Sequence, residues 1–247
     1  MAEFGVPIEL APGLMVMWGD RESCRVPFFS DRAIRQGTEG FALDAECKRQ
    51  AYGLDALWFF KQEHTVTGKV IRDDDAGGVH LVLAQDGDYF ITNVLKIGLG
   101  VGTADCLPII FFDPVNRVIA AAHAGWKGSV QGIAPIVLRR MQLEFGVQPS
   151  DVCVWFGPSA NVCCYEVQPD FQKNLFHDFV ALTIERRDEK IFFSNVRYNE
   201  LLLLQAGVAH NNIDLKFNYC TICNARFHSR RNDGALYVGQ SSVAWLI

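Results

Sequence analysis

The chain of 247 residues lacks the features of membrane, secreted and nucleic-acid-binding proteins. It has no stretch of about 18 apolar residues that could span a membrane, and its opening, MAEFGVPIELAPG, has neither the basic start nor the apolar core of a signal peptide. A formal net charge of −5 provides no basic surface for nucleic acid. We therefore expect a cytoplasmic protein with no membrane or nucleic-acid partner.

The sequence also lacks the marks of a divided or a disulfide-held chain. No linker rich in glycine, serine or proline, no low-complexity tract and no internal repeat interrupts it, so we expect one domain spanning residues 1–247. Its 8 cysteines are too sparse for a small disulfide scaffold, and the cytoplasm keeps thiols reduced. A metal-binding or catalytic cysteine is therefore the special case to look for.

What the sequence does have is an alternation of short apolar runs and amphipathic segments. Apolar runs bounded by turn residues predict strands at 56–60, 79–84, 89–92, 97–101, 107–112, 118–122, 152–156 and 242–247. Apolar residues at helical spacing predict helices at 129–145, 169–182 and 199–206. Strands and helices mixed in this way indicate an α/β or α+β sandwich with a mostly buried sheet.

The most informative stretch, TADCLPIIFFDPVNRVIAAAHAGWKG, places a cysteine and a histidine on either side of a predicted turn. Asp113 and Pro114 favour a turn over residues 113–116, because aspartate suits its first position and proline presets the backbone of its second. In a hairpin closed by this turn Cys106 lies directly opposite His123, with Cβ atoms about 4.5–5.5 Å apart. Two ligands at that separation can share one metal ion. A loop with an odd number of residues would put the two side chains on opposite faces instead.

Three residues are candidates for one metal site: His64, Cys106 and His123. Catalytic zinc commonly takes three protein ligands and keeps a fourth position open, and thiolate and imidazole both suit this ion. Zinc also lowers the pKa of bound water to about 7, which supplies a nucleophile at physiological pH. The alternative is that Cys106 is an ordinary buried thiol and His123 a hydrogen-bonded core histidine.

Two further segments offer cations for an anionic ligand. The glycines of AGWKG, directly after His123, allow backbone to approach a ligand closely, so Lys127 at the head of the next helix is a candidate for binding an anion. The alternative for Lys127 is an ordinary exposed lysine. The arginines of RFHSRRNDG, residues 226–234, form either a solvated loop or a fork that grips phosphate or carboxylate.

The remaining cysteine pairs show no pattern strong enough to assign a role. Cys220 and Cys223 form an isolated C-x-x-C, which we interpret as two ordinary thiols because no second pair accompanies it. Cys163 and Cys164 are adjacent, and their side chains point in opposite directions if the chain is extended there. Neither pair is assigned a catalytic role.

Four groups of motifs are similar to those of one protein family. They are GTADCLPI at 102–109, AHAGWKG at 122–128, GPSA at 157–160 with CYEV at 164–167, and SRRNDG at 229–234. Together they resemble the laccase-domain, or polyphenol oxidase, family, whose members include the peptidoglycan editing factor type and purine nucleoside phosphorylases of the same fold. The resemblance spans most of residues 50–247.

The resemblance implies both a metal site and a fold. It implies a zinc ion held by the histidine of a Q-x-H motif, the cysteine of TADC and the histidine of HAGW. QEH at 62–64 matches the first motif, so His64 is the expected third ligand, with His80 as the alternative. The implied fold is α+β, a single-domain α/β/β/α sandwich with mixed sheets, similar to the fold of a toxin deamidase.

The activity that the resemblance implies is phosphorolysis of purine nucleosides. Adenosine, inosine or guanosine and phosphate would give the free base and ribose 1-phosphate, with adenosine deaminase activity alongside. The residues expected to carry this chemistry are, for catalysis, Cys106, His123 and Asp105 and, for substrate binding, Lys127, Arg231 and Gln62. Asp105 is expected to orient a ligand or to accept a proton, and the cations to hold phosphate.

Three other functions remain open. An amidohydrolase with Cys106 as nucleophile, or with zinc as activator, would edit cell-wall precursors such as a UDP-muramoyl-amino acid. A non-catalytic metal-binding or partner-binding module is the second. The older family name suggests a polyphenol oxidase and makes copper the alternative metal. A multicopper oxidase, however, needs about ten histidines, and this chain has 6, with no His-x-His pair.

Overall fold

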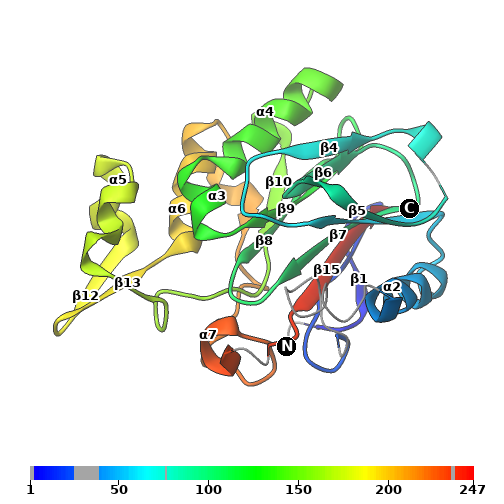
Figure 1. Ribbon diagram of the computed structural model, residues 1–247. Coiled ribbons are helices and arrows are strands. Elements are labelled where there is room, and N and C mark those ends of the chain that lie inside the picture. The colour runs from blue at the N-terminus through cyan, green and yellow to red at the C-terminus, as the bar shows by residue number, and fades with distance from the viewer. Residues whose placement is uncertain (1–2, 25–38, 76, 235–236) are drawn as a thin grey trace.

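The computed structural model describes residues 3–24, 39–75, 77–234 and 237–247. Two six-stranded sheets pack face to face, and helices cover their outer sides (Figure 1). The expected α+β fold with mixed sheets is therefore confirmed. Within the described residues, no helix combines the length and the apolar character that crossing a membrane would take.

The first sheet contains the first and the last strand of the described residues. Its strands, in spatial order, are β1 (Pro7–Ala11), β2 (Leu14–Met17), β15 (Gln240–Leu246), β7 (Ile97–Thr103), β3 (Ala56–Lys61) and β5 (Gly78–Asp86). β3 runs parallel to both β5 and β7, and the other pairs are antiparallel.

The second sheet contains the predicted hairpin. Its strands, in spatial order, are β14 (Ile213–Asp214), β10 (Cys153–Phe156), β8 (Leu107–Asp113), β9 (Val118–Ala124), β6 (Tyr89–Thr92) and β4 (Gly68–Ile71). Its two outermost pairs, β14 with β10 and β4 with β6, are parallel, and the pairs between them are antiparallel. A small third sheet, which lies to one side in Figure 1, consists of β11 (Glu166–Val167), β13 (Lys190–Phe193) and β12 (Ile184–Arg187).

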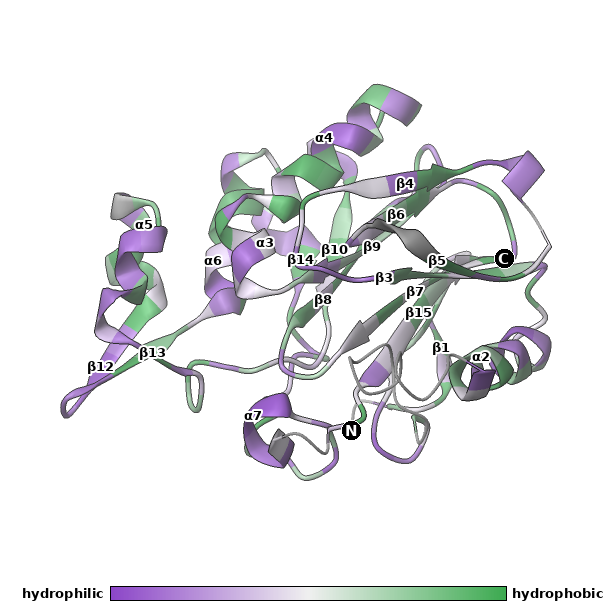
Figure 2. Cartoon of the chain, viewed as in Figure 1, coloured by the Kyte–Doolittle hydropathy of each residue, from purple (hydrophilic) through white to green (hydrophobic). Residues whose placement is uncertain are grey.

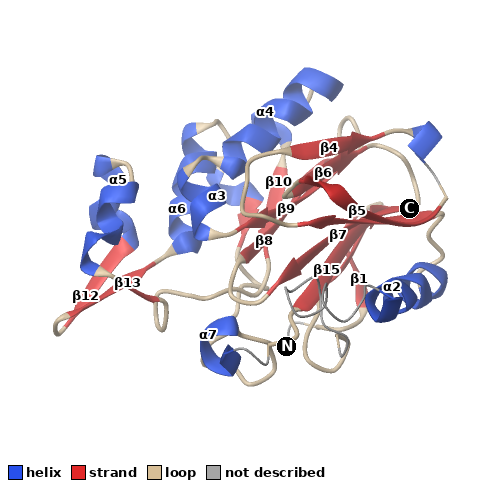
Figure 3. Ribbon diagram, in the orientation of Figure 1, coloured by secondary structure: helices blue, strands red, loops and turns tan. Residues whose placement is uncertain are grey.

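Helices complete the layers on both sides, as Figure 3 shows. α2 (Glu39–Ala51) packs on the outer face of the first sheet. The second sheet is covered by α4 (Ile133–Phe145), beside which lie α3 (Trp126–Val130) and α6 (Asn195–Gln205). The other helices of the described residues are α5 (His177–Thr183), α7 (Arg230–Asp233) and the 3₁₀ turns η1 (Asp73–Asp75), η2 (Pro149–Asp151), η3 (Pro169–Asn174) and η4 (His210–Asn212).

The hairpin strands are apolar because they are covered on both faces. Every residue of β8 and β9 is buried, with one face toward the first sheet and the other toward α4. A strand in this position is mostly apolar rather than alternating, and green predominates along parts of the central strands in Figure 2. The same feature made these strands recognisable in the sequence as uninterrupted apolar runs.

The register of the hairpin differs from the expected one by two residues. His123 faces Pro108, and Asp113 faces Val118, so the loop comprises residues 114–117. The Asp113 carboxylate accepts hydrogen bonds from the loop, and this holds the longer connection. The direct pairing of Cys106 with His123 was therefore wrong. An even shift keeps the alternation of faces, however, so the two residues remain neighbours.

Two predicted helices are interrupted where the backbone requires it. Gly132, at φ 83°, ends the turn that follows α3, so the expected helix over 129–145 consists of α3 and α4. The segment 169–182 likewise divides into η3 and α5. α6 begins earlier than expected, because the Ser194 hydroxyl caps it by accepting the Arg197 N–H at 3.1 Å.

Candidate metal centre

The three candidate ligands come from separate parts of the first and second sheets. His64 lies in the loop after β3, Cys106 in the loop between β7 and β8, and His123 near the end of β9. Their ligand atoms all lie within 4.8 Å of one another. The sulfur of Cys106 is 3.5 Å from Nε2 of His64, and the two imidazole ring centres are 4.8 Å apart. The fold therefore places His64, Cys106 and His123 close together, as the sequence analysis expected.

A buried carboxylate, Asp88, supports two of these residues and was missed in the sequence. Its Oδ1 lies 2.7 Å from Nδ1 of His123 and accepts the backbone N–H of His64 at 3.1 Å. Its Oδ2 accepts both the backbone N–H and the hydroxyl of Thr65 at 2.6 Å. A carboxylate on Nδ1 fixes the imidazole orientation and leaves Nε2 for a metal, the arrangement common behind zinc-bound histidines.

The backbone around the centre is shaped by two unusual positions. His64 has φ 61°, a left-handed conformation that only a well-held non-glycine residue adopts, and the Asp88 carboxylate holds it. Gly125 follows His123 by two residues. A Cβ at this glycine would lie 2.3 Å from Cδ2 of His64 and 3.1 Å from the Cys106 sulfur. The glycine of HAGW is therefore needed because the ligands occupy the space of a side chain.

Electrostatics favour a thiolate at Cys106. Burial alone would raise its pKa, but the charge of His123 and hydrogen bonds from His123 and His64 lower the pKa. Burial would lower the pKa of His123, yet Cys106 and Asp88 raise that pKa instead. Burial would raise the pKa of Asp88, but the hydrogen bonds and charge of His123 and the bonds from Thr65 lower that pKa.

This donor set fits a single metal ion with an open position. Thiolate and imidazole are ligands that zinc prefers, and three protein ligands leave room for a fourth. His123 is buried, whereas His64 and Cys106 are partly exposed, so the centre opens to one side. His80 does not belong to this group. It lies in β5 with its ring stacked on Trp58, the ring centres being 3.9 Å apart.

Asp105 and Arg231 meet beside the centre. Asp105 directly precedes Cys106 at φ 85°. Its Oδ1 accepts the Thr221 hydroxyl at 2.7 Å, and its Oδ2 accepts the backbone N–H of Arg231 at 2.8 Å. Both carboxylate oxygens are thus engaged in holding neighbouring loops, which suits an orienting group.

The other expected substrate-binding residues differ in their surroundings. The Gln62 amide accepts the N–H of Gly102 at 2.8 Å and donates to its carbonyl at 2.7 Å, so it joins the loop after β3 to β7. Lys127 is exposed in α3, with its ammonium 5.9 Å from the ring centre of Trp126. The Arg231 guanidinium donates to the carbonyl of Glu166 at 2.8 Å.

Tyr165 is a further residue of the site to which sequence reasoning gave no role, although it lies within the CYEV motif. The Arg231 guanidinium lies over its ring, 5.0 Å from the ring centre. Burial and the charge of Cys106 raise the pKa of the Tyr165 phenol, so it remains protonated at neutral pH. A neutral phenol beside a thiolate is a hydrogen-bond donor.

The interpretation of the other cysteines as unrelated thiols was wrong. Cys163 and Cys164 lie in a turn rather than in an extended segment, and they meet the C-x-x-C of Cys220 and Cys223. The four sulfurs lie within 4.8 Å of one another, and all four residues are free cysteines.

Comparison with known proteins agrees with the motifs. Residues 43–246 match the family described as multi-copper polyphenol oxidoreductase laccase. The purine nucleoside phosphorylase of Aquifex aeolicus is 32% identical over 185 residues, which cover 75% of this chain and 81% of the relative. The human purine nucleoside phosphorylase LACC1 is 33% identical over 152 residues, or 60% of this chain, and the matched segment spans only 35% of that protein's length.

Among solved structures, the Bacillus licheniformis hypothetical protein YfiH superposes with a TM-score of 0.82 at 22% identity, covering 98% of this chain and 96% of the other. This likeness shows a shared fold. The family match extends over most of the chain and includes every ligand of the candidate centre. The chain therefore belongs to the multi-copper polyphenol oxidoreductase laccase family, in which it shares sequence similarity with purine nucleoside phosphorylases.

Proposed function

We propose that this chain is a zinc-dependent purine nucleoside phosphorylase that also deaminates adenosine. The observation that carries the proposal is the convergence of His64, Cys106 and His123 within 4.8 Å in a chain related to purine nucleoside phosphorylases. Zinc held by these three residues would act as a Lewis acid and would lower the pKa of a water at its open position.

The protein's own contribution to phosphorolysis is to hold phosphate against the ribose. An oxygen of phosphate attacks C1′ while the bond from C1′ to the base nitrogen breaks, and the electron pair leaves with the purine. The attacking group is anionic, so it needs a cation. Lys127 at the start of α3, two residues after Gly125, and Arg231 at the start of α7, whose backbone N–H bonds Asp105, are the proposed phosphate ligands.

The departing purine needs a proton or a hydrogen bond. The Tyr165 phenol stays protonated, and the position of Arg231 over its ring keeps the two groups together. We assign Tyr165 as the donor to the base or to the substrate hydroxyls. Asp105 orients this part of the site through its bonds to Thr221 and Arg231.

The proposal is tested by incubating the purified chain with adenosine, inosine or guanosine, with and without phosphate, and separating the products by chromatography. We expect free base and ribose 1-phosphate only when phosphate is present, and inosine from adenosine in its absence. His123→Ala should abolish both reactions, whereas Cys47→Ser, which changes an exposed cysteine in α2, should leave them unchanged. No product with any of the three nucleosides would overturn the proposal.

A second candidate is an amidohydrolase, and one observation favours it. Cys106, His123 and Asp88 form a chain in which a thiolate is paired with an imidazole that a carboxylate orients. This is the arrangement of nucleophile, base and orienting group found in thiol hydrolases. In such an enzyme the thiolate would attack an amide carbonyl, and the amine would leave with a proton from His123.

Metal dependence separates the two candidates. Hydrolysis of a muramoyl-amino acid amide by the Cys106 thiolate should increase after chelation, because a bound metal occupies the sulfur. Nucleoside turnover should stop under the same conditions and return on adding Zn²⁺. The second candidate would be favoured if the protein hydrolysed the amide after its metal was removed by a chelator and the zinc-loaded protein did not convert nucleosides.

A further inference from the structure

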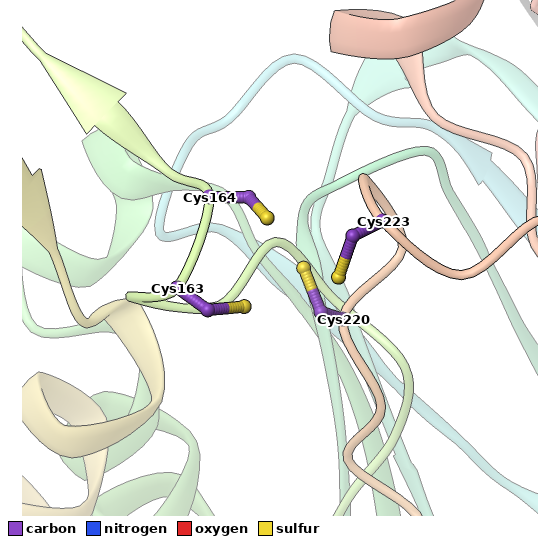
Figure 4. A group of neighbouring side chains, drawn as sticks. All are labelled: Cys163, Cys164, Cys220 and Cys223. Atoms are coloured by element: carbon purple, nitrogen blue, oxygen red, sulfur yellow. The ribbon is translucent and has the colours of Figure 1, made fainter.

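Four cysteines outside the candidate active site gather around one point. Figure 4 shows the side chains of Cys163, Cys164, Cys220 and Cys223 approaching from two segments, with their sulfurs directed toward a common centre. The sulfurs all lie within 4.8 Å of one another, and none is in a disulfide. Cys163 and Cys223 are exposed and Cys220 is buried, so the cluster is reachable from solvent on one side.

The backbone holds the two segments in register independently of the sulfurs. A parallel bridge joins Ser159 to Cys220, with the Ser159 N–H bonded to the Tyr219 carbonyl at 3.1 Å. The Thr221 N–H returns a bond to the Ser159 carbonyl at 3.0 Å. The first pair sits in a turn closed by the bond from the Cys164 N–H to the Asn161 carbonyl, 2.9 Å long. The sulfurs are thus presented by a fixed frame.

Hydrogen bonds at Cys220 suit an anionic sulfur, whereas burial and the neighbouring thiols raise the pKa of Cys163 and Cys164 in the metal-free chain. Backbone N–H groups of Asn161, Ile222 and Cys223 donate to the sulfur of Cys220. In a C-x-x-C turn, such N–H donors stabilise the first cysteine as a thiolate. The Arg187 guanidinium also bonds the carbonyls of Val162 and Cys163, which places a cation beside the turn.

Four free thiols this close together provide the donors for a tetrahedral metal site. Tetrahedral zinc with bonds of about 2.3 Å brings its sulfurs to about 3.8 Å of one another, and the four sulfurs here lie within 4.8 Å of one another. Sites with four thiolates and no open position are the structural kind of zinc site. We propose that Cys163, Cys164, Cys220 and Cys223 bind one Zn²⁺ as a structural site, separate from the ion at His64, Cys106 and His123.

Hydrogen bonds connect the cysteine cluster to the loop that carries Cys106. Thr221, between the two cysteines of the C-x-x-C, donates its hydroxyl to Asp105, which precedes Cys106. Ala160, in the other segment, donates its N–H to the carbonyl of Asp105 at 2.8 Å. Tyr165 directly follows Cys164 in the chain. An ion joining the two segments would therefore also fix the loop that presents Cys106.

The test is metal analysis of the full chain, purified under reducing conditions without added metal and then equilibrated with Zn²⁺ and freed of excess by gel filtration. Elemental analysis should give two zinc ions per wild-type chain and one in the Cys220→Ser/Cys223→Ser variant. Cys47→Ser, at an exposed cysteine outside both sites, should retain two. Unchanged zinc content in the double variant would overturn the proposal.

A second measurement leaves the cluster intact, so it does not depend on the folding of the double variant. In Cys106→Ala/His123→Ala, zinc-edge X-ray absorption of the remaining ion should fit four sulfur ligands at about 2.3 Å. Nitrogen or oxygen ligands would count against the site, as would intact-mass detection of disulfides within the cluster in the reduced preparation. Neither readout uses nucleosides, so failure of the proposed activity and failure of the second site are distinguishable.

Discussion

The two ligand clusters of this chain differ in composition, support and exposure. The centre of His64, Cys106 and His123 has mixed nitrogen and sulfur donors, lies at the ends of sheet strands and has the Asp88 carboxylate behind it. The cysteine cluster has four thiols, lies on loops and is held by backbone hydrogen bonds. Three protein ligands leave a coordination position open for a reactive group, whereas four thiolates close the coordination shell.

The comparison also shows how one site can depend on the other. Asp105 lies between them and accepts bonds from Thr221 on the cluster side and from the Arg231 backbone on the other. We therefore expect substitutions at the three-ligand centre to remove activity outright, and substitutions on the connecting residues to reduce it in part.

The largest effect is expected from His123→Ala. Removing a residue that only supports a metal ligand lowers activity about 10- to 100-fold. Removing a proposed ligand itself should therefore lower the rate of phosphorolysis by more than about 100-fold. Zinc content should fall by one ion, with the cluster ion retained. Steady-state assays and elemental analysis measure the two outcomes. His210→Ala, at an exposed histidine of η4, is the matched control, and loss of both ions in His123→Ala would mean that the two clusters are not separate sites.

Asp88→Asn should have the next largest effect. The amide keeps the shape but loses the charge that orients His123, so zinc affinity or activity should fall about 10- to 100-fold. A competition titration with a chelating dye measures the affinity directly. An unchanged affinity and rate would show that Asp88 is a folding residue and not a support for the metal ligand.

Thr221→Val should give a smaller, partial effect. It removes one hydrogen bond to Asp105, worth roughly 0.5–1.5 kcal/mol, so we expect activity to fall about 2- to 10-fold with both zinc ions retained. Thr221→Ser keeps the hydroxyl and should restore the rate. If Thr221→Ser is as slow as Thr221→Val, the methyl group and not the bond to Asp105 is responsible.

The smallest expected effect is on the pH dependence of stability. The pKa of Asp88 in the folded chain lies below its ordinary value of about 3.9, so its ionised form stabilises the fold above that pH. This contribution should disappear as the pH falls through the folded pKa. Denaturant unfolding of metal-free protein from pH 7 to pH 3 should show wild type converging on Asp88→Asn at the acid end. A constant difference between them would contradict the assignment.

Local patterns in the sequence predicted β3, β5–β10 and β15 but not β1, β2, β4 or β11–β14, and the family motifs pointed to the three candidate ligands. The apolar runs of β8 and β9 are continuous because both faces are buried, and the family motifs carry Cys106 and His123. The hairpin register was missed because Asp113 and Pro114 fit two loop lengths equally well, and only packing decides between them.

Long-range features could not be read from the sequence in the same way. Asp88 lies 35 residues from His123 and 24 from His64, and no local motif connects them. The cysteine cluster needs a bridge between Ser159 and Cys220 to bring its pairs together. An isolated C-x-x-C is uninformative until the fold supplies its partner.

The loop over residues 114–117 is a suitable place to attach a label to this protein. It forms the end of the hairpin opposite to His123, and Val115 in it is 71% exposed. Five buried residue pairs, from Asp113–Val118 to Ile109–Ala122, lie between this loop and the pair Pro108–His123. A fluorophore or an affinity peptide attached there would report on or immobilise the protein while leaving the chemistry at the other end undisturbed.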